Sequence, residues 1–113
     1  MDFLERLNLY RVMWVLVFYD LPTDTKKERM AAARFRKDII ADGFTMFQFS
    51  IYMRHCASMD NAQVHVKRVM ACLPDKGSVG VLCITDKQLA DMKIFQCRKV
   101  KQANVPGAQL ELF

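Results

Sequence analysis

A single acidic residue, Asp20, closes an apolar segment that begins at Val12. This segment is rich in β-branched and aromatic residues, which predicts a central strand buried on both faces. A carboxylate at the C-terminal end of such a strand is held by a rigid element beside an open loop, a common place for function. Asp20 is therefore the first candidate for chemistry. The alternative is that it only hydrogen-bonds the turn formed by residues 21–24.

This turn leads into a predicted helix with a clear start. Thr25 and Glu28 have the spacing of a capping box, in which both side chains bond the first free amides of the helix. The helix should continue to about residue 41, because Gly43 is a natural stop. Its buried stripe is predicted to contain Ala31, Ala32, Phe35 and Ile39.

The rest of this helix is strongly basic. Six bases and two acids give it a charge of +4, which is most of the net charge of +5 on the chain. A solvated helix face normally mixes both signs, so this imbalance favours contacts with a phosphate backbone. The predicted nucleic-acid-binding residues are Lys26, Lys27, Arg29, Arg34, Arg36 and Lys37.

Residues 44–54 alternate between apolar and polar side chains, as a β-strand does, and a break is predicted near Gln48. The polar row should face water, a dimer partner or a nucleic-acid backbone. One predicted face carries Phe47, Phe49, Ile51 and Met53, and the polar row carries Gln48, Ser50, Tyr52 and Arg54.

A second helix and a further strand complete the predicted fold. The helix runs from Asp60 to before Pro74, and residues 78–85 form an apolar strand. The order βαββαβ predicts a ferredoxin-like α+β sandwich, with both helices on one face of an antiparallel sheet. The buried stripe of the second helix is predicted to be Ala62, Val66, Val69, Met70 and Leu73.

Length and composition point to a single domain over residues 1–113, with enough apolar residues for a core. The charged start does not match a signal peptide, and no apolar span reaches the roughly 18 residues of a membrane helix. The four widely spaced cysteines are expected to be reduced core residues, which favours a cytoplasmic protein. His55 and His65 near Cys56 match no structural zinc spacing.

The C-terminal tail, residues 98–113, ends in an alternating apolar segment. After a turn-prone segment at residues 86–88, a short strand is predicted around residues 94–97. Residues 109–113 should add a strand to another sheet edge, with Leu110, Leu112 and Phe113 as partner-binding residues. The same five residues also look like the short peptide by which bacterial proteins bind the replication sliding clamp.

Two motifs in this order resemble a known family. They are Val17-Phe18-Tyr19-Asp20 and Gln48-Phe49-Ser50-Ile51-Tyr52, joined by the basic helix. The chain is similar to the CRISPR-associated proteins of family two, which are small ferredoxin-like adaptation subunits that partner the CRISPR integrase. The resemblance covers about residues 11–113, so residues 1–10 form an N-terminal extension. The long tail resembles members from type II systems.

This resemblance implies a prokaryotic homodimer in which Asp20 of each subunit lies near the two-fold axis and the pair binds Mg²⁺ or another divalent cation. It implies metal-dependent cleavage of RNA or DNA, with Tyr19 and Asp20 as catalytic residues. The dimer would also bridge integrase dimers and hold the incoming spacer DNA, with Lys26, Lys27 and Arg29 at the family's basic positions.

Physical reasoning supports part of this, since one carboxylate is too few for a well-held ion and a two-fold dimer supplies a second. A ribonuclease toxin of related fold and a purely structural dimer are the alternatives.

Overall fold

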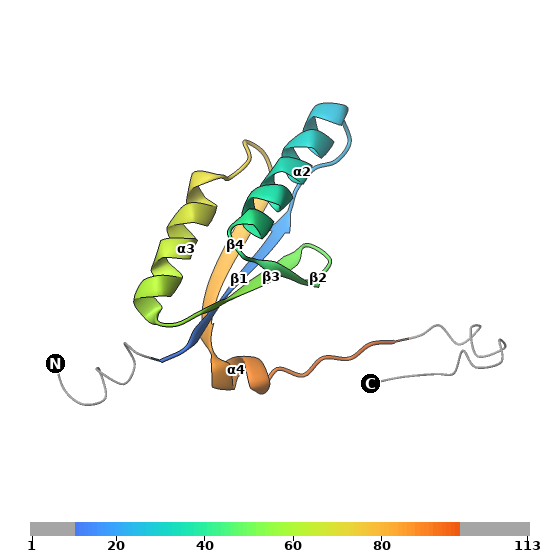
Figure 1. The fold of residues 1–113 in the computed structure, drawn as a ribbon. Coiled ribbons are helices and arrows are strands. Elements are labelled where there is room, and N and C mark those ends of the chain that lie inside the picture. Colours follow the sequence, from blue (N-terminus) through green and yellow to red (C-terminus); the bar gives the residue numbers. More distant parts are fainter. Residues whose placement is uncertain (1–10, 98–113) are drawn as a thin grey trace.

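The computed structural model describes residues 11–97, and its elements follow the predicted βαββαβ order with one short helix added (Figure 1). Four antiparallel strands form one sheet in the order β2-β3-β1-β4, and α2 and α3 cover one of its faces. This α+β arrangement is that of a ferredoxin-like fold. The elements are β1 (Met13–Asp20), α2 (Lys26–Ala41), β2 (Thr45–Gln48), β3 (Ile51–Cys56), α3 (Met59–Ala71), β4 (Ser78–Thr85) and α4 (Asp86–Ala90).

β1 is a central strand, as predicted, but it is buried on both faces only in its middle part. Val15 and Val17 face the helices and are inaccessible to solvent. Phe18 belongs to the opposite face and is 45% exposed. Leu16 on that face is buried, so the prediction of burial on both faces was wrong only toward the end of the strand, where both long helices lie on the other side of the sheet.

The start of α2 confirms the predicted capping box between Thr25 and Glu28, and the helix ends just before Gly43, which has a φ of +96°. Phe35 and Ile39 are buried, whereas Ala31 is exposed. Ala31 was wrongly placed in the stripe because the core-facing direction of the helix is set by the larger Phe35 and Ile39.

The predicted break near Gln48 is confirmed by the β2–β3 hairpin. The pairing register shifts between Met46 and Gln48, and Ser50 adopts a left-handed conformation with a φ of 64°. The predicted polar row was wrong at Tyr52, which is buried beneath the helices. Tyr52 shares the core-facing side of the sheet because the break changes which side chains lie on each face.

α3 begins one residue before the predicted start. Ala62 and Val69 are buried as expected, but Met70 and Leu73 are exposed. The polar His65 is buried instead. The predicted stripe was too wide, since a residue at the position of Met70 points away from the direction shared by Ala62 and Val69.

The segment after β4 differs from the prediction. Residues 86–90 form the short helix α4, because Thr85 and Gln88 make a second capping box. No strand forms at residues 94–97, so that prediction was wrong. The predicted extension at residues 1–10 and the predicted terminal strand in residues 98–113 lie outside the described residues.

All four cysteines are free thiols, as predicted, although Cys97 is exposed rather than in the core. Among the helices of residues 11–97, none is long and apolar enough to cross a membrane.

Candidate functional site

Asp20 is the last residue of β1, and its side chain is exposed. Tyr19 packs against the core, so strand alternation assigns Asp20 to the opposite, open face together with Phe18. On the β4 side Asp20 pairs with Ser78. The preceding Gly77 has a φ of +96°, and a Cβ there would lie 2.7 Å from the Asp20 carbonyl oxygen. Gly77 therefore lets the start of β4 approach the end of β1 closely.

Tyr19 lies beside Asp20 in the chain but is directed to the other face of the sheet. Its ring meets Phe35 edge-on, with centroids 5.3 Å apart, and lies nearly parallel to the ring of Tyr52 at 6.1 Å. Burial, followed by the neighbouring Tyr52, raises the pKa of Tyr19, so its phenol stays protonated at neutral pH. The structure therefore places a neutral phenol under α2 and a carboxylate on the open face.

Tyr52 connects this aromatic cluster to the basic helix. Arg36 Nε donates a hydrogen bond of 2.7 Å to the Tyr52 hydroxyl. The Tyr52 ring is otherwise buried, which explains how a polar residue can occupy the core. Sequence reasoning missed this pair, because it placed Tyr52 in a polar row outside the core.

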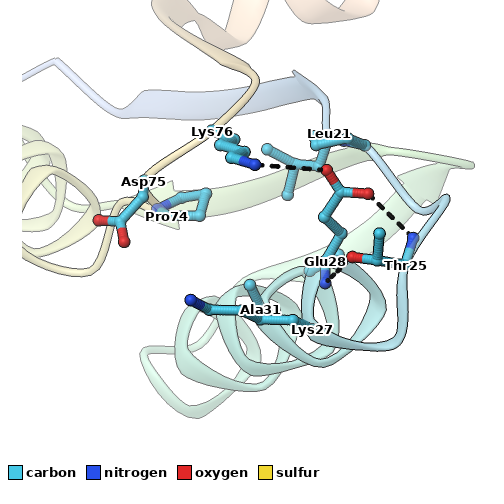
Figure 2. Close-up of a pocket in the computed structure, with 10 residues that line it drawn as sticks. Leu21, Thr25, Lys27, Glu28, Ala31, Pro74, Asp75 and Lys76 are labelled. Carbon is cyan, nitrogen blue, oxygen red and sulfur yellow. Dashed lines mark hydrogen bonds and ion pairs between the residues drawn. The ribbon is translucent and has the colours of Figure 1, made fainter.

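The loop after Asp20 is fixed by the first turn of α2. Arg29 Nη1 donates hydrogen bonds of 3.1 Å to the carbonyl oxygens of Thr23 and Asp24. Thr25 and Glu28 exchange the two capping bonds, at 2.9 and 3.1 Å, and Glu28 Oε2 lies 3.9 Å from Lys76 Nζ (Figure 2). These contacts hold the loop, and therefore the surroundings of Asp20, in one arrangement.

Glu28 is thus a structural acid. The hydrogen bonds from Thr25, above all from its backbone amide, and the nearby Lys76 hold the pKa of Glu28 below its usual range. Figure 2 shows its carboxylate at the rim of a cavity of about 120 Å³ between the start of α2 and the loop that carries Pro74 and Asp75.

The six predicted nucleic-acid-binding residues are all exposed, but they do not form a single surface. Arg29 and Arg36 reach toward the loop after Asp20 and toward β3, respectively. We call these two the arginine flank of α2. The other four line a broad depression between α2 and the end of α3, together with Leu73 and Pro74, and we call them the lysine flank: Lys26, Lys27, Arg34 and Lys37.

A polar cluster at the opposite end of α2 was also missed by sequence reasoning. His65 Nδ1 lies 2.8 Å from Asp42 Oδ2, and Arg68 Nη1 lies 2.7 Å from Asp42 Oδ1. Burial alone would raise the pKa of Asp42, but the hydrogen bonds from Arg68 and His65 lower it below its ordinary value. The sequence held one indication of this cluster, because His65 and Arg68 are three residues apart and therefore share one side of α3. This cluster joins the two helices far from Asp20.

Comparison with known proteins decides the family. The model of the family described as CRISPR associated protein Cas2 matches residues 13–92. The chain belongs to this family. The resemblance in the two motifs is therefore confirmed.

Three relatives named CRISPR-associated endoribonuclease Cas2 extend this result. The protein from Flavobacterium psychrophilum is 56% identical over 108 residues, which cover 96% of this chain and 94% of the relative. The protein from Parvibaculum lavamentivorans is 52% identical, covering 89% of this chain and all of the relative. A third, from Rhodospirillum rubrum, is 44% identical and covers 92% and 96%. The alignment with Cas2 relatives therefore spans nearly the whole chain.

A metal site in one subunit would have few ligands. Within residues 11–97 no three His, Cys, Asp or Glu side chains are close enough together to hold an ion. An exposed carboxylate suits Mg²⁺, which keeps several waters and is often bound through only one or two carboxylates. Asp20 therefore suits Mg²⁺, and a second copy of the chain would add a second carboxylate to such a site.

Proposed function

We propose that this Cas2-family chain is a metal-dependent endoribonuclease whose site forms when two copies place their Asp20 carboxylates together. The observation that carries the proposal is Asp20 itself, an exposed carboxylate at the end of a central strand and on the open face of the sheet. The names of the relatives support the reaction, since each is called an endoribonuclease.

The open face supports the homodimer in this proposal. It carries Phe18 and Leu82, which are 45% and 51% exposed, so an apolar sheet surface faces solvent in the single chain. Such surfaces are usually covered by another layer. A second copy would cover it through an isologous interface, in which every residue is repeated across the two-fold axis. The interface would then supply the second Asp20.

The proposed chemistry depends on a few residues of the chain. Asp20 from each subunit would hold Mg²⁺ or another divalent cation. When bound, such an ion supplies charge neutralisation at phosphate oxygens and a water of lowered pKa. Arg29, which contacts the loop after Asp20, would hold a phosphate of the RNA strand, while Tyr19 and Tyr52 support the end of β1 from beneath. Tyr19 is thus proposed as a positioning residue.

Neither histidine lies where it could act as a general base at Asp20. His65 is bonded to Asp42, and His55 packs edge-on against Trp14, with ring centroids 4.9 Å apart. Trp14 is six residues before Asp20 on β1, so neither of the two histidines of the chain is next to Asp20. Cleavage should accordingly be slow and strictly dependent on the metal.

The test is the substitution Asp20→Ala in highly purified protein. Cleavage of a single-stranded RNA in the presence of Mg²⁺ should be abolished, because the metal ligand is removed. Dimer mass in light scattering and spacer integration with the CRISPR integrase should be nearly unchanged. Cleavage at the wild-type rate would remove Asp20 from the site.

In the cell we propose a role in CRISPR adaptation, in which the homodimer bridges integrase dimers and the spacer DNA duplex lies across it. The lysine flank supports this part, since its four bases line one continuous depression that could follow a phosphate backbone.

A non-catalytic dimer remains a second candidate, because each subunit offers a single carboxylate and no histidine at the site. Family membership argues against the toxin alternative.

The terminal residues 109–113 are proposed to add a strand to the sheet of the second copy or of the integrase, with Leu110, Leu112 and Phe113 in apolar pockets. Deleting residues 108–113 should reduce dimer mass or integrase binding in light scattering. Intact assemblies that have lost only sliding-clamp binding would favour the clamp alternative.

A further inference from the structure

Gly77, the residue before β4, lies against the backbone at the end of β1. A Cβ added at Gly77 would be 2.7 Å from the Asp20 carbonyl oxygen and 3.1 Å from the Leu21 Cα. Ordinary van der Waals contacts of a Cβ begin at 3.4 Å. The difference between 2.7 and 3.4 Å means that any side chain at Gly77 requires a displacement of about 0.7 Å.

Asp20 depends on β4 for its position. The pairing of β3 with β1 extends only as far as Phe18. Within the strands of residues 11–97, Asp20 is therefore paired only with β4, through Ser78, the residue that follows Gly77. A shift at the start of β4 would act directly on Asp20, while the pairing with β3 would keep the rest of β1 in place.

Leu21 closes the other side of this contact. Its Cδ2 would lie 2.7 Å from a Cβ at Gly77, and its side chain packs against the core. Figure 2 shows Leu21 beside Lys76, the residue before Gly77. Because the core restrains Leu21, an added Cβ would displace mainly the backbone at Asp20 and the start of β4.

Gly43 provides a comparison within the same chain. Gly43 and Gly77 both have a φ of +96°, so a substitution to Ala meets similar backbone strain at both positions. The nearest atoms to a Cβ at Gly43 belong to the Arg54 guanidinium, at 3.0 to 3.4 Å, which is the far end of a flexible side chain. The difference between the two glycines therefore isolates the backbone contact with Asp20.

We propose that Gly77 is a positioning residue for the metal site, because the missing Cβ lets β4 hold Asp20 where two copies can share an ion. Groups in such sites must be held to within about 0.5 Å of the productive geometry, which a displacement of about 0.7 Å exceeds. A two-fold axis would repeat the displacement in the second subunit. This role rests on the proposed function and adds a requirement outside the metal ligands.

The first experiment measures metal binding without RNA. Mn²⁺ is the probe, because EPR counts its free aquo ion directly. Gly77→Ala in the full chain should weaken Mn²⁺ binding by about tenfold or more, whereas Gly43→Ala should bind as wild type. Equal weakening in both variants, or unchanged binding in Gly77→Ala, would overturn the role of Gly77.

Gly77→Asn separates the position of Asp20 from the stability of the chain. Asn adopts a positive φ more readily than Ala but carries the same Cβ. Urea denaturation should therefore show Gly77→Asn to be more stable than Gly77→Ala, and it replaces that variant if Gly77→Ala does not fold. Its Mn²⁺ binding should remain weak, while the matched Gly43→Asn should bind as wild type. Restored Mn²⁺ binding in Gly77→Asn would overturn the proposal, because backbone strain would then be the cause.

A readout without metal distinguishes this role from the proposed nuclease. The amide NMR resonances of Asp20 and Leu21 should move in Gly77→Asn, while those of Val15 and Val17 stay in place. Moved resonances in a chain whose wild type binds no Mn²⁺ would contradict the metal site and leave Gly77 as the residue that positions Asp20. Unmoved resonances in a chain whose wild type binds Mn²⁺ and cleaves RNA would remove the role of Gly77 and leave the nuclease.

Discussion

The two faces of the sheet differ in almost every physical respect. The face under α2 and α3 buries Val15, Val17 and Tyr52 almost completely. The open face leaves Phe18 and Leu82 about half exposed and ends at the exposed Asp20. α4 contacts only its far end, where Trp14 Nε1 donates a hydrogen bond to the Asp86 carboxylate.

This difference separates folding from function within a single sheet. The covered face provides the apolar burial that stabilises the subunit. The open face carries the apolar surface for assembly and the carboxylate proposed for chemistry. Substitutions on the two sides should therefore have different consequences, although neighbouring residues of one strand carry both.

The largest effect is expected on the covered face, from Phe35→Ala. Phe35 is buried and its ring packs against Tyr19, so its loss should lower the free energy of unfolding by about 3–5 kcal/mol. Urea denaturation followed by circular dichroism measures this change. Met30→Ala, an exposed position on the same helix, should cost less than about 0.5 kcal/mol. Equal losses would mean that α2 does not pack as described.

The open face should respond through assembly. Leu82→Glu places a charge in the proposed interface and should halve the mass measured by light scattering, while circular dichroism stays unchanged. Val64→Glu is the matched control, since Val64 has a similar exposure on the outer side of α3 and should leave the dimer intact. A dimer that tolerates Leu82→Glu would place the interface elsewhere.

The basic helix is expected to have an intermediate effect on DNA binding by the assembled complex. Changing Lys27 and Lys37 of the lysine flank together to Glu should weaken duplex binding and lower the slope of log affinity against log salt. Each lost phosphate contact contributes about 0.9 to this slope, so two contribute about 1.8. Lys67→Glu with Lys93→Glu changes the charge equally at exposed positions outside α2. An unchanged slope in the α2 variant would show that the helix faces solvent.

The smallest effect is expected from the polar cluster that joins α2 and α3. Because the folded state holds the pKa of Asp42 below its ordinary value, this residue stabilises the fold above about pH 4. That contribution is lost as the pH falls through the lowered pKa. Asp42→Asn should therefore reduce the free energy of unfolding by about 2 kcal/mol at pH 7, and by less at pH 3. Asp75→Asn, at an exposed position, should show no such difference.

Much of the fold could be predicted from the sequence because its strongest signals are local. β1 and β4 are long apolar strands, and the capping box needs only Thr25 and Glu28, which are three positions apart in the sequence. The position of Asp20 followed from the end of β1. These features require no knowledge of which elements pack together.

The errors concern residues whose environment is set by distant partners. Tyr52 was placed in a polar row outside the core, yet Arg36 satisfies its hydroxyl and allows the ring into the core. His65 is buried because Asp42, 23 residues earlier, bonds its ring. Phe49 was assigned to one apolar face with Ile51 and Met53, and the left-handed Ser50 interrupts the alternation between them. Sequence patterns alone do not reveal such pairings.

The claim that most needs testing is that one site is shared by two Asp20 residues. Two differently tagged copies, one wild type and one carrying Asp20→Asn, can be co-expressed and the mixed dimers purified on both tags in sequence. If each ion needs both carboxylates, the mixed dimer should cleave single-stranded RNA at less than about a tenth of the wild-type rate. A mixed dimer that retains half of the wild-type rate would contradict the account, because each subunit would then act alone.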